Sequence, residues 1–158
     1  MKNPKRLILL LFVAALLTSA PFAAFGVPQN WNDAQIHWMS FDEGLKAAKK
    51  TNKPVCLIFF TTWCPHCTNY SKLFSNPALV SKSQSFVMIR IDADKNQELS
   101  EKYSLDGEYI PRTYFFSPDG TVDPSLMEEQ DDFKYYYTED DPRSILAGMD
   151  RALKKFQN

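Results

Sequence analysis

The amino-acid sequence predicts an α/β fold of three layers, in which helices flank a central mixed β-sheet. The apolar run Val55–Phe60 shows no alternation of polar and apolar residues, which is typical of a strand covered on both faces. Strand-like and helix-like segments alternate up to Tyr103, and this order favours parallel strands joined by helical crossovers. The turn signal Pro118-Asp119-Gly120 then indicates a hairpin, which adds antiparallel strands to the sheet.

The first 26 residues have the pattern of a secretory signal peptide. Basic residues precede an uninterrupted apolar run, Leu7–Leu17, and small residues follow as far as Gly26. This run is shorter than the about 20 apolar residues that a membrane-spanning helix needs. The stretch as far as Phe25 could serve as an uncleaved anchor, but we expect cleavage after Gly26.

The charge balance changes when residues 1–26 are removed. They hold three of the 18 Lys and Arg and none of the 19 Asp and Glu, which leaves 15 basic against 19 acidic residues. A mildly acidic chain without a basic cluster gives no indication of nucleic-acid binding. The remaining roughly 130 residues suit one domain with its own core. We expect a polar lead-in at residues 27–35 and a monomeric domain at residues 36–158.

The segments before the buried strand predict an edge strand and a helix. Ile36–Trp38 alternates as a short edge strand does. Ser40 and Glu43 are spaced as a capping box, in which each side chain satisfies the other's backbone N–H. The helix that follows ends at about Asn52 and is amphipathic, so we expect it to lie on the sheet. Its apolar face consists of Phe41, Leu45 and Ala48.

The middle of the chain supplies two helices, a second buried strand and a further short helix. Asn69–Ser75 continues a helix, and Asn76-Pro77 interrupts it before a second helix at Ala78–Lys82. Phe86–Asp92 has the composition of a strand covered on both faces, and Gln97–Tyr103 that of a short helix.

The last third of the chain is expected to begin with antiparallel strands. Arg112–Ser117 and a strand that begins near Thr121 flank the predicted turn. Asp123–Asp141 is acidic and rich in aromatic residues, and we interpret it mostly as a loop whose aromatic side chains cover a sheet face. A closing helix begins at Pro142, a good first-turn residue. Apolar residues keep helical spacing to the end at Ile145, Leu146, Met149, Leu153 and Phe156.

A pair of cysteines in Trp63-Cys64-Pro65-His66-Cys67 carries the predicted chemistry. At a strand-to-helix junction, unpaired backbone N–H groups and the positive end of the helix dipole favour a thiolate at the first cysteine. The thiolate is the attacking species in disulfide exchange. Cys67 lies one turn further on, near enough to close a small disulfide ring or to release a mixed disulfide. Pro65 suits the first helical turn, where its missing N–H is not needed.

Other interpretations of the cysteines are weaker. A structural zinc site usually needs four ligands, and no second C-x-x-C or His-x-His cluster follows. A c-type haem site needs His directly after the second cysteine, where this chain has Thr68. A merely structural disulfide would close too short a loop to stabilise much chain. We therefore expect no metal and no cofactor, and we interpret Cys56 as a small buried hydrophobe more readily than as a redox partner.

The order of elements, together with the C-x-x-C pair, resembles the thioredoxin fold over about Ile36 to Phe156. Trp63-Cys64-x-x-Cys67 is similar to the active site of the thioredoxin family, and Ile110-Pro111 is similar to its cis-proline segment. The resemblance implies a thioredoxin-like three-layer fold with Cys64 and Cys67 as the catalytic residues. It also implies that Ile110 and Pro111 pack against the cysteines, with a cis peptide bond, and present backbone groups to a bound substrate.

Two segments resemble a narrower group. Lys53-Pro54 and Asp106–Arg112 look like small secretory thioredoxins of the endoplasmic-reticulum and anterior-gradient group. Those proteins usually end in a retention tetrapeptide, whereas this chain ends Lys155-Phe156-Gln157-Asn158. The difference favours a bacterial-style exported relative, periplasmic or otherwise extracytoplasmic.

The dipeptide Pro65-His66 is similar to that of the strongly oxidising periplasmic enzyme DsbA. His66 could donate to the Cys64 thiolate or attract it as a cation, and we expect Pro65, His66 and Trp63 to tune the acidity of that thiol. A stabilised thiolate favours the dithiol state, so the disulfide becomes the better oxidant. The alternative is that His66 is only a solvent-exposed helix residue.

One position departs from the family. Thioredoxins carry a buried carboxylate six residues before the first cysteine, where it moves protons for the second, and this chain has Ile58 there. Cys67 must then lose its proton to water or to another acid, for which the sequence suggests Glu108. The large helical insertions of DsbA-type oxidases also find no room in this chain.

The expected function is exchange of the Cys64–Cys67 dithiol or disulfide with exported cysteine-containing proteins, as an oxidant or isomerase. Two alternatives stay open: a reductase supplied with electrons by a membrane redox partner, and a non-catalytic module that binds client proteins beside Ile110-Pro111. The intact C-x-x-C favours an enzyme. The direction of electron flow does not follow from the residues.

Overall fold

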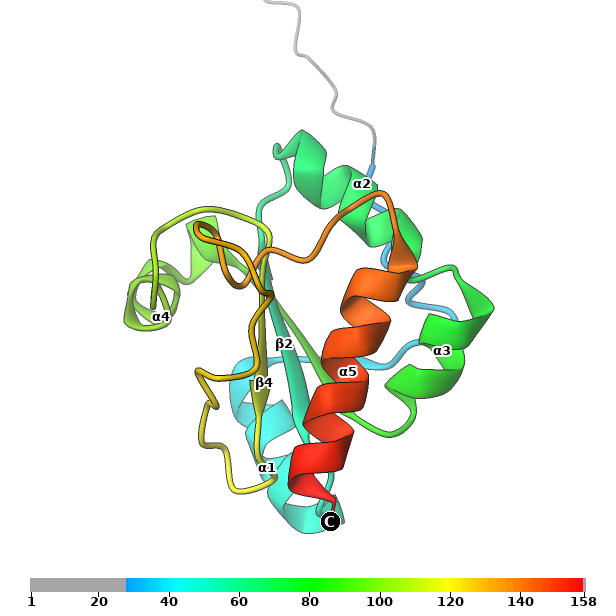
Figure 1. Cartoon of the computed structure of the whole chain (residues 1–158). Coiled ribbons are helices and arrows are strands. Elements are labelled where there is room, and N and C mark those ends of the chain that lie inside the picture. Colours follow the sequence, from blue (N-terminus) through cyan, green and yellow to red (C-terminus); the bar gives the residue numbers. More distant parts are fainter. Residues whose placement is uncertain (1–27, 158) are drawn as a thin grey trace, which may run out of the picture.

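Four strands form one mixed β-sheet in the computed structural model, which describes residues 28–157 (Figure 1). The predicted signal peptide, residues 1–26, lies outside the described residues. The strands, in sheet order, are β1 (Trp38–Met39), β3 (Val87–Asp92), β2 (Val55–Phe60) and β4 (Arg112–Phe116). β1 and β2 run parallel to β3, and β4 runs antiparallel to β2. The predicted mixed sheet with a parallel first part is confirmed.

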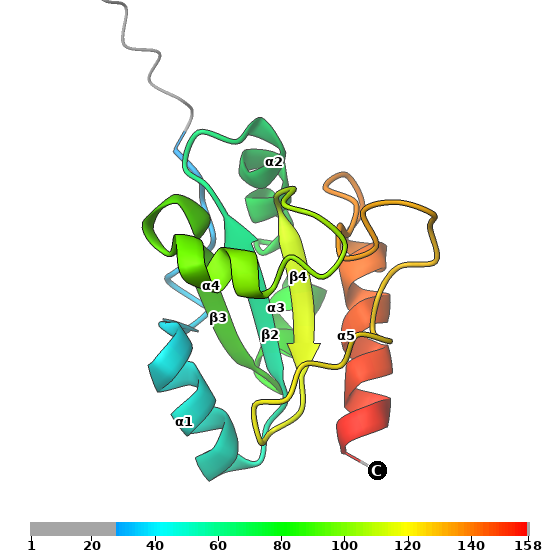
Figure 2. The same ribbon diagram turned by 90° about the vertical axis from the view of Figure 1, so that its left-hand side faces the viewer.

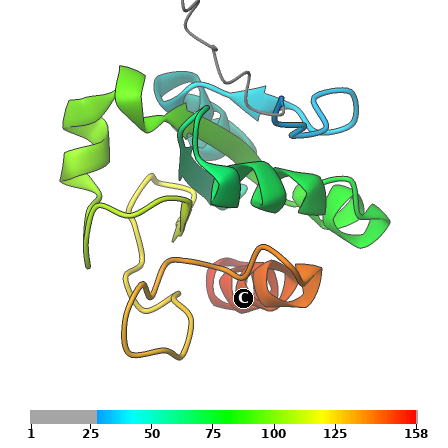
Figure 3. The same cartoon turned by 90° about the horizontal axis from the view of Figure 1, so that it is seen from above.

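Helices cover both faces of this sheet. α1 (Phe41–Thr51) and α4 (Gln97–Lys102) lie on one face, and a 3₁₀ turn at Ala93–Lys95 precedes α4. The other face carries α2 (Pro65–Leu73), α3 (Pro77–Ser83) and α5 (Pro142–Phe156). Seen from above, α1 and α5 lie on opposite sides of the sheet (Figure 3). The three-layer prediction is therefore correct, and the helix boundaries agree within two residues.

The central strand β2 explains why its sequence does not alternate. β3 and β4 flank it (Figure 2). Cys56 and Ile58 point into the core under α2, α3 and α5, whereas Val55, Leu57 and Phe59 point into the core under α1. Successive side chains of a strand face opposite sides, so a strand with a core on each side is apolar throughout.

Two predictions near the N-terminus need correction. The edge strand is Trp38–Met39 and not Ile36–Trp38, because the N–H of Ile36 donates to the carbonyl of Asn32 in a turn. The predicted capping box forms differently as well. Ser40 precedes α1 as its N-cap, but its hydroxyl donates to the Glu43 carboxylate (2.7 Å) and makes no bond to a backbone N–H.

The lead-in segment is fixed to the sheet. Trp31 is buried, and its indole packs edge-on or tilted against Trp38, Phe60 and Phe74. The Gln29 side-chain amide donates to the carbonyl of Thr61 (2.7 Å) just beyond β2. The chain therefore enters the domain beside the end of β2 that leads to the cysteines.

The predicted second hairpin strand is wrong for the described part of the chain. One isolated bridge, between Phe116 and Val122, replaces a strand near Thr121. Pro124 follows two residues later, and a proline cannot donate to a ladder. The edge of β4 is instead covered by the loop of residues 123–141, since the Thr113 N–H donates to the Tyr135 carbonyl (2.8 Å).

The aromatic residues of this loop reach both faces of the sheet, where we predicted one. Tyr135 packs against Tyr114 with ring centroids 4.5 Å apart, on the side of α1. Tyr137 packs edge-on against Phe115 at 5.9 Å, on the side of α5. Side chains two residues apart reach opposite faces because the loop runs around the edge of β4.

Candidate active site

The two cysteines occupy the beginning of α2, immediately after the turn that follows β2. Cys64 is the N-cap residue, and Pro65 is the first residue of the helix. The Cys67 N–H donates to the Cys64 sulfur (3.3 Å), which satisfies one of the unpaired donors at the helix start. The sulfur that we expect to react therefore accepts a backbone hydrogen bond and faces the positive end of the helix dipole.

Both thiols are free and poorly exposed. Cys67 is fully buried, whereas Cys64 keeps 3% of its surface in contact with solvent. Cys64 is thus only slightly more accessible than Cys67. Burial raises the pKa of the Cys67 thiol, and the hydrogen bond with Cys64 acts in the same direction; the backbone of Thr61 opposes them.

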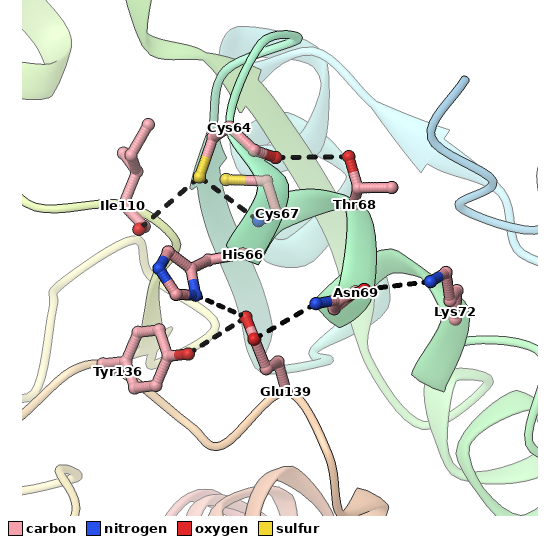
Figure 4. Close-up of polar contacts among 9 residues, drawn as sticks. All are labelled: Cys64, His66, Cys67, Thr68, Asn69, Lys72, Ile110, Tyr136 and Glu139. Carbon is pink, nitrogen blue, oxygen red and sulfur yellow. Dashed lines mark hydrogen bonds and ion pairs between the residues drawn. The ribbon is translucent and has the colours of Figure 1, made fainter. Parts of the chain in front are cut away.

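The segment Ile110-Pro111, immediately before β4, faces the cysteine pair. Its peptide bond is cis, as predicted. The Ile110 carbonyl oxygen lies 3.9 Å from the Cys64 sulfur, within reach of the thiol proton (Figure 4). The sequence motif and the proline segment are therefore brought together as the resemblance implies.

Trp63 stands beside the pair with 68% of its surface exposed. Its indole N–H donates to the Asp94 carboxylate (2.7 Å), which holds the ring at the rim of an open hollow of about 400 Å³. The hollow is lined by Thr61, Trp63, Ala93, Asp94, Gln97, Ser100, Glu101, Glu108 and Ile110. Ile110, whose carbonyl oxygen lies 3.9 Å from the Cys64 sulfur, is one of these lining residues, so the hollow lies beside the reactive pair.

His66 points away from α2 toward the loop of residues 123–141. Its side chain is 62% exposed, and its Nδ1 lies 3.0 Å from the Glu139 carboxylate (Figure 4). The ring of Tyr136 packs edge-on to it at 6.4 Å. The expected donor to the Cys64 thiolate is thus engaged with a carboxylate through one of its two ring nitrogens.

Glu139 is the residue of the site that the sequence did not indicate. Its carboxylate is only 13% exposed and accepts hydrogen bonds from Tyr136 (3.1 Å) and Asn69 (3.2 Å) as well as His66. It lies 73 positions from His66 in the chain, in an acidic stretch, and no local pattern separates it from its neighbours. The loop brings it to α2 because its tyrosines are anchored on both sides of β4.

Three residues bear on how Cys67 could lose its proton: Ile58, Glu108 and Glu139. Ile58 is buried in the core, so the position of the usual carboxylate is apolar. Glu108 is exposed and lines the hollow bounded by Trp63. The carboxylate whose charge acts on Cys67 is Glu139, which adds to the rise in the pKa of this thiol. Glu139 is therefore a better candidate than Glu108 for an acid near the pair.

Neither a metal cluster nor a membrane span is found in residues 28–157. No group of three or more His, Cys, Asp or Glu side chains there could hold a metal ion. None of the described helices is both long enough and apolar enough to cross a bilayer.

Comparison with known proteins agrees with this arrangement. Residues 37–118 match the sequence profile of a family described as thioredoxin-like. Anterior gradient protein 3 of Xenopus tropicalis is 29% identical over 132 residues, which cover 82% of this chain and 78% of that protein. The human anterior gradient protein 2 homolog is 30% identical over 128 residues, which cover 80% and 71%. A thioredoxin from Thermus thermophilus superimposes with a TM-score of 0.61 at 21% identity over 77% of this chain and 89% of that chain, which shows a shared fold.

Proposed function

Because the chain belongs to the thioredoxin-like family, we propose that it is a thiol–disulfide oxidoreductase acting through Cys64 and Cys67. The observation that carries the proposal is the position of Cys64 at the start of α2, with Cys67 one turn further on and the Ile110 carbonyl opposite. A helix start favours the thiolate that exchange requires, and the second thiol can attack the first within the same molecule.

The exchange proceeds in two steps with a mixed disulfide between them. In the oxidising direction, a substrate thiolate attacks Cys64 of the Cys64–Cys67 disulfide and releases Cys67 as a thiolate that takes up a proton. A second substrate thiolate then attacks the substrate sulfur of the mixed disulfide and releases Cys64. The substrate loses two electrons and the protein gains them. Reduction is the same sequence in reverse, with Cys67 releasing the substrate.

We propose further that the protein works as an oxidant or isomerase on exported cysteine-containing proteins, and that it does so as a monomer. Pro65-His66 supports this direction by its likeness to the DsbA dipeptide, and the basic and apolar pattern of residues 1–26 supports export out of the cytoplasm. The hollow between Trp63 and Ile110 offers room for the chain that flanks a substrate cysteine. A reductase fed by a membrane partner and a non-catalytic binding module remain the alternatives.

The first prediction separates an enzyme from a binding module. Cys64→Ser should abolish both insulin reduction and oxidation of a dithiol peptide, since the thiol at the helix start is lost and Cys67 has no partner left for a disulfide. Cys67→Ser should accumulate a mixed disulfide with the substrate on a non-reducing gel, because the resolving thiol is lost. As a control, Cys56→Ala should keep the wild-type rate, because Cys56 is buried in β2 away from the exchange. Equal rates for Cys64→Ser and wild type would contradict the proposed function.

A further inference from the structure

The carboxylate of Glu139 joins the loop of residues 123–141 to the helix that begins with Cys64. Two of its three donors, His66 Nδ1 (3.0 Å) and Asn69 Nδ2 (3.2 Å), belong to the first turns of α2. The third, the Tyr136 hydroxyl (3.1 Å), belongs to its own loop. Figure 4 shows Tyr136 and Asn69 on either side of Glu139, with the His66 ring between Glu139 and the cysteines. The carboxylate is therefore held at a defined place next to the reactive pair.

The charges around this carboxylate are few. Lys72 reaches Glu139 only through Asn69: its Nζ donates to the Asn69 side-chain oxygen (2.9 Å). Asp140 is the next residue along the loop and is exposed. Glu139 is thus the acidic group closest in the network to His66, and an ionised carboxylate can only accept hydrogen bonds. The Nδ1 of His66 must then carry a proton in this pair, whatever the state of its Nε2.

A carboxylate paired with His66 changes what the histidine does for the thiolate. An unpaired imidazolium attracts a thiolate, whereas an imidazolium next to a carboxylate presents a dipole whose field falls off faster with distance. The same carboxylate opposes the appearance of negative charge on either cysteine, and its charge contributes to the rise in the pKa of Cys67. A weaker attraction on a thiolate at Cys64 leaves the dithiol state less stabilised, which favours the disulfide. Cys67 is protonated at pH 7, so its raised pKa does not itself change this balance.

We propose that Glu139 is a positioning residue that holds the His66 ring, offsets its charge, and thereby lowers the reduction potential of the Cys64–Cys67 pair. The inference rests on the proposed function and deepens it. With Glu139 in place, the pair is a milder oxidant than its Cys-Pro-His-Cys sequence indicates. Such a moderated potential suits exchange in both directions, which an isomerase needs.

The test is the equilibrium of the pair with glutathione at pH 7. Protein disulfide and two glutathione thiols give protein dithiol and one glutathione disulfide, so two electrons are transferred. Glu139→Gln keeps the shape and removes the charge. It should raise the equilibrium constant toward the dithiol by about threefold or more, which is about 14 mV for a two-electron couple. Asp140→Asn removes the same charge one residue away and should change the constant less than about twofold. An unchanged constant in Glu139→Gln overturns the proposal.

A double-mutant cycle tests the part played by His66. His66→Ala should change the constant less than about twofold in the wild-type background, where Glu139 offsets the imidazolium. In the Glu139→Gln background the same change should lower the constant by more than about threefold. Equal effects of His66→Ala in both backgrounds would mean that Glu139 does not act through His66.

A measurement on the unaltered protein keeps the inference testable if Glu139→Gln fails to fold. The chain has two histidines, so His66→Ala identifies the ¹⁵N ring signals of His66. The neutral His66 ring should carry its proton on Nδ1, and an Nε2–H tautomer would overturn the pairing with Glu139. A wild-type protein that never equilibrates with glutathione would instead overturn the proposed function, and the tautomer would still decide the pairing.

Discussion

Cys64 and Cys67 lie three residues apart and meet different surroundings. Cys64 faces the helix start and the Ile110 carbonyl, whereas Cys67 is enclosed by the protein and its thiol pKa is raised by burial. Cys56 is also enclosed, and burial raises its pKa. The three thiols of the chain should therefore react in a fixed order, although the slight exposure of Cys64 slows even the first of them.

This order is a prediction for alkylation of the reduced protein. Iodoacetamide at neutral pH should label Cys64 first, because it alone combines a helix start with some solvent contact. Cys67 and Cys56 should remain unlabelled until the protein is unfolded in urea. Peptide mapping by mass spectrometry after short reaction times gives the order, and preferential labelling of Cys67 would reverse the assignment of nucleophile and resolver.

At the level of elements, the contact between α5 and the loop of residues 123–141 depends on a missing side chain. Gly148 lies on the buried face of α5, and a Cβ there would stand 2.5 Å from Cε1 of Tyr137. The ring of Tyr137 in turn packs on Phe115 of β4. The absence of a side chain at Gly148 lets the loop run close to the helix and continue to Glu139.

Gly148→Ala should therefore destabilise the protein by about 1 to 2 kcal/mol, since overpacking of the ring outweighs the about 1 kcal/mol that alanine gains in a helix. Urea unfolding at neutral pH measures the free energy of unfolding. In a Tyr137→Leu background, where the ring is gone, the same substitution should be neutral or stabilising. A gain in stability in the wild-type background would show that helix propensity decides at this position.

The elements that were predicted well are those with a local cause. Both predicted ends of the strand Val55–Phe60 agree with the structure, because a core on each side of the sheet leaves an uninterrupted apolar run in the sequence. α3 and α5 each have a proline as their first residue, so the steric preference of proline marked their beginnings within one residue. The predicted strand Ile36–Trp38 was wrong at its start, because the Ile36 N–H donates to the Asn32 carbonyl in a turn. Strand propensity carries no information about such a turn.

The residues of the candidate site also fall into two groups: those that a local motif indicates and one that only the tertiary structure places. The cysteines and Ile110-Pro111 were found from short motifs. Glu139 was not, because its place beside His66 results from the path of a loop around β4 and from two tyrosines that face opposite sides. A contact across 73 positions with no periodic pattern requires the tertiary structure.

For the whole molecule, the two buried thiols predict a fall in stability at alkaline pH. Burial raises the pKa of Cys56 and Cys67 in the folded protein, so the unfolded chain loses these protons first, above about pH 8.5. The stabilisation is complete at neutral pH and decreases as the pH rises. Between pH 7.5 and 9.5 each thiol should cost about 1.4 kcal/mol of the free energy of unfolding.

Urea unfolding of the reduced protein at both pH values measures this loss. Oxidation to the Cys64–Cys67 disulfide should remove the contribution of Cys67, and Cys56→Ala should remove that of Cys56. Unfolded tyrosine ionises near pH 10, so each buried tyrosine also lowers the free energy of unfolding at pH 9.5, by about 0.2 kcal/mol. The oxidised protein and Cys56→Ala share this background, so the differences from the reduced wild type isolate the two thiols. A free energy of unfolding that is constant between the two pH values would contradict the assignment.

The hydrogen bond from Gln29 to the Thr61 carbonyl decides which end of the chain should carry a fusion partner or label. It fixes the entry of the chain three residues from Cys64, whereas α5 finishes at Phe156 at the far end of the domain (Figure 1). A fusion partner, fluorophore or immobilisation tag joined ahead of residue 28 would stand next to the cysteines and hinder large substrates. The same attachment after Phe156 leaves the end of the domain that carries the cysteines accessible to substrates.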